Sequence, residues 1–486
     1  MKRIIWIAII LILNNGLLLS QSCLPDGITF NYQAQIDSFP INYPNCNTIE
    51  GFVYINGSNI KDLTGLSQID SIGGDLHIWG NDSLADLTGL EALKRIGGNL
   101  RIGIYYAYAQ TYNPVLSSLT GLDGLGEIGG SLEVSVNHDL INCEGLENLH
   151  TIGGSLYFRN NINMVNLSGL DNLEFIGEDI TIGGQLSLID FTGLEGISHV
   201  NGNLILGACS IYVDALQGNG NSSYHGLHNI IQIDGNLELC RLKCCDLSGF
   251  DNLTEVGGRL IIRRTSLTSL SGIETLQYVG NGIDLGDWND WYQATMGNPD
   301  LTSVEGLIGV SSIGGGILRI EANYSLTSLS GLDNIDPMTI GQLKIDNFPS
   351  PTGDMPVLSH CAIKSICDYL NLPGANAWIA HNDEGCLSIA EVLDSCEASA
   401  GVKLFSGKEI KIFPNPSETV LYIEIPDKTL IQTLVLRNSI GQTIREFHNP
   451  GETINLAGVS PGIYLIEIRT DLGSLTRKLV ITNRFR

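Results

Sequence analysis

Apolar residues recur in a fixed pattern along most of the chain. From Leu76 to Leu100, a Leu-x-Ile triplet precedes several spaced leucines and an Ile-Gly-Gly segment, after which the next triplet begins. Alternation within a triplet predicts a short strand whose middle side chain faces outward. Twelve triplets follow one another at spacings of 23 to 35 residues, with the middle residues Tyr54, His77, Arg101, Glu133, Tyr157, Thr181, Ile205, Glu238, Ile261, Asp284, Arg319 and Lys344.

A repeat of this length predicts a solenoid of stacked turns. One turn cannot bury its own leucines and isoleucines, whereas stacking pairs the strands in parallel and forms a continuous apolar core. The Gly-Gly segments and a second Gly-Leu corner permit positive φ or close approach of neighbouring backbones. We therefore expect a mainly β protein with a parallel β-solenoid of about twelve turns over residues 46–346, preceded by an irregular lead-in at residues 21–45.

Three spacings are long because insertions follow the outward strand at Gly103–Pro114, Gly207–Ser223 and Gly286–Asn298. All three are expected to leave the solenoid at the same edge. Aromatic residues in exposed loops on a rigid frame are typical of binding surfaces, although such loops also fold back to cover apolar surface. The candidate ligand contacts in the insertions and in the outward row are Tyr105, Tyr106, Trp288, Trp291, Tyr292, Tyr157, Arg101 and Arg319.

Residues 46–55 and the turns that follow them resemble a known module. The run C-N-T-I-E-G-F-V-Y-I, with its Leu-x-Ile turns up to about residue 346, is similar to the receptor L domain, the β-solenoid of insulin-receptor-type ectodomains. The resemblance implies the fold and carries over no ligand, because this chain has no cysteine-rich module between two lobes. Leucine-rich repeats are the nearest alternative fold. Asn81 stands where their asparagine ladder lies, whereas Gly207 and Arg264 occupy that place in other turns.

Residues 347–397 differ from the repeats and predict a small helical cap over the last turn. One helix is expected at Ile363–Leu370, and a capping box at Ser388–Glu391 predicts the start of a second. Eleven cysteines in an exported chain indicate disulfides, and their odd number leaves at least one without an internal partner. The candidates are Cys361, Cys367, Cys386 and Cys396 in the cap, with their pairing open, Cys23 with Cys46, and Cys209 with Cys240.

After a linker at residues 398–407, alternating apolar residues and turn signals predict a small antiparallel β-sandwich over residues 408–486. This segment resembles the type A C-terminal sorting domain of the bacterial type IX secretion system. The resemblance implies export, recognition by the secretion machinery, removal of the tail, and release or attachment at the cell surface. The residues that match its motifs include Pro414, Asn415, Pro416, Gly441, Pro461, Gly462, Tyr464 and Lys478.

Residues 1–20 predict a secretory signal peptide, since Lys2 and Arg3 precede an apolar run at residues 4–19. A membrane anchor and a lipoprotein modified at Cys23 are the alternatives. The apolar run is short and interrupted, and residues 20–22 fit a lipidation motif poorly. We therefore expect no transmembrane span in the mature protein, and a location outside the cell, either secreted or attached to the outer surface.

The charge distribution excludes some partners. The chain has a net charge of −26, and residues 21–407 hold 14 Lys/Arg and 44 Asp/Glu, a net charge of −30. A body this acidic is not expected to bind nucleic acid, because phosphate contacts need a basic face. Cys240, Cys244 and Cys245 have no histidine at metal-ligand spacing, and His225 and His228 have no evident third ligand, so no metal or cofactor is expected.

These features favour a non-enzymatic binding or adhesion protein whose ligand is a glycan or a protein. The alternatives are a secreted β-solenoid polysaccharide-degrading enzyme and a passive spacer or surface-layer protein. An enzyme of that kind needs carboxylates that converge on one face. In the outward row, Glu133, Glu238 and Asp284 are separated by other residues, which favours a binding face over a catalytic cleft.

Overall fold

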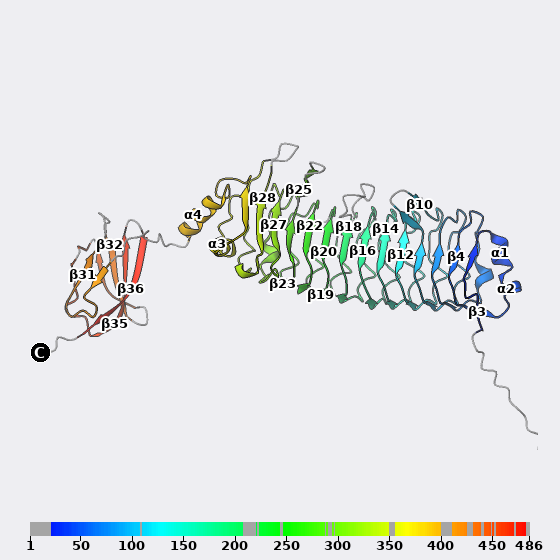
Figure 1. The fold of residues 1–486 in the computed structure, drawn as a ribbon, viewed down its shortest axis with the longest axis horizontal. Coiled ribbons are helices and arrows are strands. Elements are labelled where there is room, and N and C mark those ends of the chain that lie inside the picture. The colour runs from blue at the N-terminus through cyan, green and yellow to red at the C-terminus, as the bar shows by residue number, and fades with distance from the viewer. Residues whose placement is uncertain are drawn as a thin grey trace, which may run out of the picture. The chain divides into compact units, whose positions relative to one another are not determined.

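The computed structural model describes residues 21–106, 109–207, 220, 223–243, 246–286, 288–289, 294–295, 297–348, 355–399, 411–424, 431–438, 442–448, 450–451, 453–470 and 473–482, so the predicted signal peptide lies outside them. The chain divides into two compact units, residues 1–359 with 374–383 and residues 360–373 with 384–486. In the first unit, parallel strands stack side by side in a row (Figure 1). The predicted fold class is confirmed: a mainly β solenoid, short disulfide-linked helices and antiparallel sheets.

The main sheet of the solenoid contains fourteen parallel strands among the residues described. Twelve of them are the twelve predicted triplets, and one further strand lies at each end. In sheet order the strands are β2 (Ile28–Phe30), β4 (Val53–Ile55), β6 (Leu76–Ile78), β8 (Leu100–Ile102), β12 (Leu132–Ser135), β14 (Leu156–Arg159), β16 (Ile180–Gly183), β18 (Leu204–Gly207), β20 (Leu237–Cys240), β22 (Leu260–Arg263), β24 (Gly282–Leu285), β27 (Ile317–Glu321), β28 (Gln342–Asp346) and β29 (Ala377–Ala380).

The strand register follows the repeat. Leu76 pairs with Leu100, and Leu100 pairs with Leu132 one turn later. All three leucines are fully buried, as is Ile78 at the other end of its triplet. Equivalent apolar residues therefore form continuous columns, which bury the surface that a single turn would leave exposed.

A second row of short parallel strands lies at the Ile-Gly-Gly segments. Gly97 in this row packs directly on the turn before it, since a Cβ atom there would lie 2.3 Å from the carbonyl oxygen of Gly73. Close approach therefore explains Gly97 and its equivalents, whereas Gly314 and Gly315 in a later segment have positive φ. The strands are β1 (Gln21–Cys23), β3 (Cys46–Ile49), β5 (Ser71–Ile72), β7 (Arg95–Ile96), β11 (Glu127–Ile128), β13 (Thr151–Ile152) and β15 (Phe175–Ile176) in one sheet, and β17 (His199–Val200), β19 (Gln232–Ile233), β21 (Glu255–Val256) and β23 (Tyr278–Val279) in another.

The prediction of an irregular lead-in at residues 21–45 is wrong. This segment supplies strands to both sheets, β1 and β2, and the helices α1 (Gln33–Asp37) and α2 (Phe39–Asn42). Ile36 and Phe39 are buried, and the rings of Phe39 and Phe30 lie 5.8 Å apart. A disulfide between Cys23 and Cys46 joins β1 to β3, as predicted. The repeat pattern did not predict these strands, because residues 21–45 lack the repeated leucines and glycines.

An asparagine ladder runs through much of the solenoid interior, so the argument against it from the sequence is wrong. The N–H of Asn137 donates to Oδ1 of Asn161 at 2.9 Å, and Asn137 is fully buried. Two insertions stand between a triplet and its asparagine, so the distance in sequence from the triplet to the ladder position is longer in those turns. In the turn that contains Arg264, the ladder position is held by Thr265, whose N–H donates to Asn298. The supposed absence of a ladder therefore does not count against the leucine-rich-repeat alternative. Its members are Asn81, Asn113, Asn137, Asn161 and Gln185 in one run, and Asn298, Asn323, Asn347 and Asn382 in another.

The insertions follow β8, β18 and β24, at the same edge of the main sheet. The first forms an antiparallel hairpin of β9 (Ile104–Tyr106) and β10 (Ala109–Thr111), and the third forms one of β25 (Trp288–Asn289) and β26 (Ala294–Thr295). Most of the second lies outside the residues described. The described residues of the solenoid also form three short 3-10 helices: η1 (Thr64–Leu66), η2 (Glu305–Leu307) and η3 (Pro337–Thr339).

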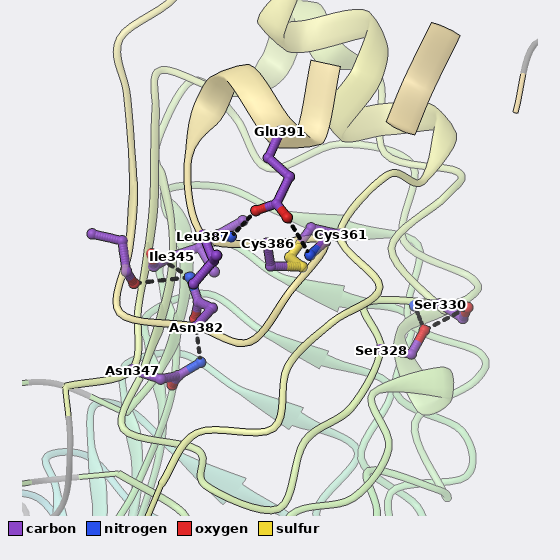
Figure 2. The surroundings of a disulfide bond; sticks show 11 residues. Ser328, Ser330, Ile345, Asn347, Cys361, Asn382, Cys386, Leu387 and Glu391 are labelled. Atoms are coloured by element: carbon purple, nitrogen blue, oxygen red, sulfur yellow. Dashed lines mark hydrogen bonds between the residues drawn. A yellow bond between two sulfur atoms is a disulfide. The ribbon is translucent and has the colours of Figure 1, made fainter. Parts of the chain in front are cut away.

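The cysteine-rich segment contains α3 (Lys364–Leu370) and α4 (Ile389–Ser399). Disulfides join Cys361 to Cys386 and Cys367 to Cys396, which resolves the open pairing. Only half of the predicted capping box forms: the N–H of Glu391 donates to Ser388, while its carboxylate accepts the N–H groups of Gly385 and Leu387 (Figure 2).

Further outcomes concern this segment and the remaining cysteines. The predicted cap range also contains β29, which belongs to the main sheet, and α4 extends two residues into the predicted linker. A helical cover over the last turn stays a prediction. Cys240 is disulfide-bonded, whereas Cys209 lies outside the described chain. Cys143 is free and buried, and burial raises the pKa of its thiol.

The described residues of the C-terminal domain form two antiparallel sheets. Their inner faces share one apolar core, to which Leu421 and Ile454 contribute from one sheet and Leu434 and Ile466 from the other. This confirms the predicted sandwich. The strands are β30 (Lys411–Phe413), β31 (Val420–Glu424) and β34 (Thr453–Asn455) in one sheet, and β33 (Thr443–His448), β32 (Ile431–Asn438), β35 (Gly462–Thr470) and β36 (Gly473–Ile481) in the other.

Candidate binding surface

The outward face of the main sheet differs in charge from the rest of the solenoid. We define this face as the middle residue of each triplet and the residues two places before and after it, which alternate onto the same side. Its net charge is −1, against −30 for residues 21–407 as a whole. Its charged residues are Arg101, Arg159, Arg259, Arg263, Arg319 and Lys344, and Asp75, Glu133, Asp179, Glu238, Asp284, Glu321 and Asp346.

Many of the other acidic residues have a structural role at the Gly-Leu corners. The N–H of Gly145, a residue with φ of +109°, donates to both carboxylate oxygens of Glu147 at 3.0 Å. A carboxylate thus satisfies a backbone donor that the tight corner leaves without a carbonyl partner. The N–H of Gly89 likewise donates to both oxygens of Glu91. A contact to one carboxylate oxygen joins Gly121 to Asp123, Gly169 to Asp171, Gly193 to Glu195, Gly249 to Asp251, Gly272 to Glu274 and Gly331 to Asp333.

A second polar ladder, which we call the outer ladder, borders the outward face. Oδ1 of Asp75 accepts the N–H of Asn99 at 2.7 Å, and Oδ1 of Asn99 accepts the N–H of Ser131 at 2.9 Å. The sequence signal is a polar residue directly before the Leu-x-Ile triplet, usually Asp, Asn or Ser, and it was missed because those residues differ in type. The ladder holds one edge of the face in register. It continues through Ser155, Asp179, Asn203 and Asn236 to Arg259.

An aromatic cluster occupies the outward face at β4 and β6. The rings of Tyr54 and His77 stack 4.8 Å apart with an angle of 7° between their planes. Phe52 lies 4.3 Å from Tyr54, and Trp79 lies 5.4 Å from it. Burial lowers the pKa of His77, which favours the neutral imidazole. The sequence did not predict this cluster, because its rings come from two turns.

Three predicted contact residues converge at β8, β12 and β14. Arg101 Nε lies 3.4 Å from Glu133, and Arg159 Nη1 lies 3.7 Å from the other oxygen of that carboxylate. The Arg159 guanidinium also stacks over the Tyr157 ring, 4.4 Å from its centroid. Tyr105, from the first insertion, lies near the Arg159 guanidinium, and burial raises the pKa of its hydroxyl. Arg101, Tyr157 and Tyr105 thus belong to one site around Glu133.

Arg319 belongs to a second charged site, which we call the cationic cluster: Arg259, Arg263, Arg319 and Lys344, with the carboxylates of Asp284 and Glu321. Arg259 and Arg263 donate to Oδ2 of Asp284 at 3.2 and 3.1 Å, and Arg319 lies 3.7 Å from Oδ1. Glu321 pairs with Arg319 and Lys344. Asp284 is fully buried, so the outward position that the triplet pattern assigns to it does not make it exposed.

The structure does not bring the remaining candidates into these sites. Arg101 and Arg319 lie eight strands apart, roughly 38 Å along the face. Trp288 is in β25, but its side chain, that of Tyr106, and all of Trp291 and Tyr292 lie outside the described residues. Their proposed ligand contacts stay predictions.

The chemistry of the face is dominated by ion pairs between strands. Glu133, Asp284 and Glu321 each contact at least two cations. Burial raises the pKa of Glu238, the property expected of a general acid. In the described part of the chain, no three His, Cys, Asp or Glu side chains are grouped so that they could hold a metal ion.

In the C-terminal domain, several predicted sorting residues make contacts that join distant segments. The Asn415 side chain donates to the carbonyl of Lys478 at 2.8 Å and accepts the N–H of Val480 at 2.9 Å. The Tyr464 hydroxyl donates to the carbonyl of Ser460 at 2.7 Å. Pro414 and Pro416 flank Asn415, while Pro461 and Gly462 lead into β35. Gly441 lies outside the described residues.

Comparison with protein families supports the prediction of a C-terminal sorting domain. Residues 411–482 match the family model described as a secretion system C-terminal sorting domain. No curated protein matches the chain. The sorting domain indicates that the type IX secretion system carries this β-solenoid protein to the outer surface or the exterior of the cell. Among the residues described, no helix is long and apolar enough to cross a membrane.

Proposed function

We propose that this secreted protein is a non-enzymatic binding or adhesion protein and that the outward face of the main sheet is its ligand-contact surface. The observation that carries the proposal is the contrast in charge. The face has a net charge of −1 in a body of −30, and it carries the aromatic cluster and six Lys/Arg side chains. Surfaces of this mixed character suit recognition of a glycan or a protein, since they combine ring faces with directed donors.

The arrangement of the carboxylates supports binding over hydrolysis. A glycosidase needs two carboxyl groups that face the same bond, with one of them protonated and the other ionised. On this face Glu133 and Asp284 are each held by arginines from neighbouring strands. The similarity of residues 46–346 to receptor L domains, modules of receptor ectodomains, also favours a binding role.

A glycan array tests the proposal. We expect binding by the wild type, weakened about tenfold in Trp79→Ala and in Trp288→Ala/Trp291→Ala if both aromatic groups contact the ligand, since one stacked ring contributes about 1–1.5 kcal/mol. Phe175→Ala, which removes an exposed ring from β15 outside the face, is the matched control. Equal binding by all variants would exclude the aromatic residues as contacts. Self-assembly of purified protein that binds no ligand would favour a spacer.

The polysaccharide-degrading enzyme is the second candidate, and the raised pKa of Glu238 is the observation that favours it. It predicts cleavage that is lost in Glu238→Gln, and also in Glu133→Gln or Asp284→Asn. Reducing-end release from a broad panel of polysaccharides measures this. Absence of turnover by the wild type across the panel would leave the binding proposal as the better account.

A further inference from the structure

We propose that the cationic cluster binds the carboxylate or sulfate groups of an acidic polysaccharide. This inference rests on the proposed function, because it names the ligand class for one part of the same face. The cluster spans β22, β24, β27 and β28, three strand spacings or roughly 15 Å. A site of this length suits several acid groups along one chain.

Burial separates the two signs of charge within the cluster. The side chains of Asp284 and Glu321 are 0% and 2% exposed. Those of Arg259 and Lys344 are 34% and 32% exposed, and those of Arg319 and Arg263 are 23% and 18% exposed. The carboxylates therefore lie beneath the cations, and a ligand that approaches from solvent meets four positive groups.

The buried carboxylates also orient the guanidinium groups. Arg259 and Arg263 both donate to the same Asp284 oxygen, and Arg259 Nε donates in addition to the carbonyl of Asn281 at 3.3 Å. Two arginines fixed from below lose little further side-chain freedom when they bind an anion. Their planar N–H groups match carboxylate and sulfate geometry better than a lysine ammonium does.

The cluster is unusual in this protein. Of the 14 Lys/Arg in residues 21–407, seven fall within residues 241–344. The acidic remainder of the body does not cancel their effect at contact range, because physiological salt screens charges beyond about 8 Å. Nearby acid groups of a ligand therefore respond mainly to the cluster and to its immediate neighbours.

Two carboxylates set the limits of the site. Asp346 beside Lys344 accepts Trp378 Nε1 and lies 2.8 Å from His381 Nδ1. Glu238 stands on the other side, next to Arg263, and burial raises its pKa. The acid groups of the ligand are therefore confined to the rows between β22 and β28.

The test uses three polymers with one backbone: dextran, carboxymethyl dextran and dextran sulfate. Binding of the full-length chain is measured by calorimetry at several salt concentrations. We expect dextran to bind weakly or not at all, and at least one charged polymer to bind with an affinity that falls as salt rises. Arg259→Gln/Lys344→Gln should weaken that binding about tenfold or more. The two charged polymers distinguish carboxylate from sulfate as the preferred group.

The control is Arg95→Gln, which removes an exposed cation that pairs with Glu127 outside the face, and it should bind like the wild type. Lys344→Gln alone leaves all three arginines on Asp284, so it tests the site even if the double variant unfolds; a loss of about threefold is expected. Unchanged affinity in a folded variant would overturn the inference. Binding of a neutral polysaccharide alone would also overturn it, yet would leave the proposed function intact. Absence of any ligand would count against both.

Discussion

The solenoid and the C-terminal domain are both built from β-strands, yet they differ in how their residues specify structure. In the solenoid each strand pairs in parallel with its copy one turn later, so Leu100 contacts Leu76 and Leu132 in the same way. In the C-terminal domain single contacts join distant segments, as Asn415 joins β36. The solenoid is thus specified by one contact repeated from turn to turn, and the C-terminal domain by contacts that occur once. The match to a family model falls in the second region, at residues 411–482.

Removing the C-terminal domain should leave the solenoid folded and abolish export of the protein from the cell. Deletion of residues 408–486 is expected to trap the protein in the periplasm, because the secretion machinery recognises that domain. Immunoblots of periplasm and culture supernatant measure the effect, which should be nearly complete. Circular dichroism of the trapped protein serves as the control for a folded solenoid. Normal amounts of the truncated protein outside the cell would refute the sorting role.

A glycine substitution should cost far more in the solenoid than in the C-terminal domain. Gly145 has φ of +109°, and an added Cβ atom would lie 2.3 Å from the carbonyl carbon of Leu119 in the turn below. Gly145→Ala should therefore destabilise the solenoid by about 3 kcal/mol or more. Gly458 also has positive φ, but the nearest atom to its added Cβ would be Arg445 Nη2 at 3.9 Å, so Gly458→Ala should cost about 1 kcal/mol.

Hydrogen exchange followed by mass spectrometry measures both glycine variants, because it reports each domain in the same sample. Protection should fall along the solenoid in the first variant and only within residues 411–482 in the second. Similar losses in the two domains would show that close contact between turns is not the dominant cost. Loss of protection in the domain that was not changed would show that the two are coupled.

A substitution in the buried asparagine ladder should cost more stability than one in the outer ladder. The Asn137 side chain donates to the carbonyls of Ile102 and Ser135 and is fully buried. Asn137→Ala removes both buried hydrogen bonds and should destabilise the solenoid by about 2–3 kcal/mol. Asn99→Ala in the half-exposed outer ladder should cost about 1 kcal/mol or less, since water replaces the lost contact.

Urea unfolding followed by tryptophan fluorescence measures the two ladder variants, because residues 408–486 contain no tryptophan and the signal reports on the solenoid. Equal shifts of the unfolding midpoint would mean that burial does not decide the strength of a ladder. A smaller shift for Asn137→Ala than for Asn99→Ala would reverse the argument.

The smallest expected effect concerns pH and is confined to the C-terminal domain. Hydrogen bonding to Arg469 lowers the pKa of Glu467, with a further contribution from Arg437. A folded-state pKa below the unfolded value of about 4.3 stabilises the domain above that pH, and the gain disappears as pH falls through the folded pKa. Glu467→Gln should cost at most about 1 kcal/mol at neutral pH and nothing in strong acid.

Local hydrogen exchange in residues 411–482, compared between wild type and Glu467→Gln at neutral and acid pH, measures this difference. The solenoid of the same variant is the internal control and should be unaffected at every pH. A cost that persists below pH of about 3 would point to lost packing and not to the ion pair.

The sequence by itself determined the strand register of the solenoid and the destination of the protein. Alternation within a triplet and the period between triplets are both visible in one dimension, so twelve strands of the main sheet were predictable. The sorting domain was predictable because its short motifs, such as those at Asn415 and Tyr464, can be read directly in the sequence, and residues 411–482 match the family model. The disulfide pairing in the cap was not, since four cysteines close in sequence allow three connectivities.

Only the tertiary structure decided how the outward row is used. Asp284 and Arg101 occupy equivalent positions, but guanidinium groups from neighbouring turns surround Asp284 and leave it fully buried. Asn113 and Asn298 return to the ladder after insertions that shift their spacing in the sequence. In each case the environment of a side chain depends on the residues that stand 20 or more positions away in the next turn. The sequence of one repeat does not specify those neighbours, because they come into contact only when the turns stack.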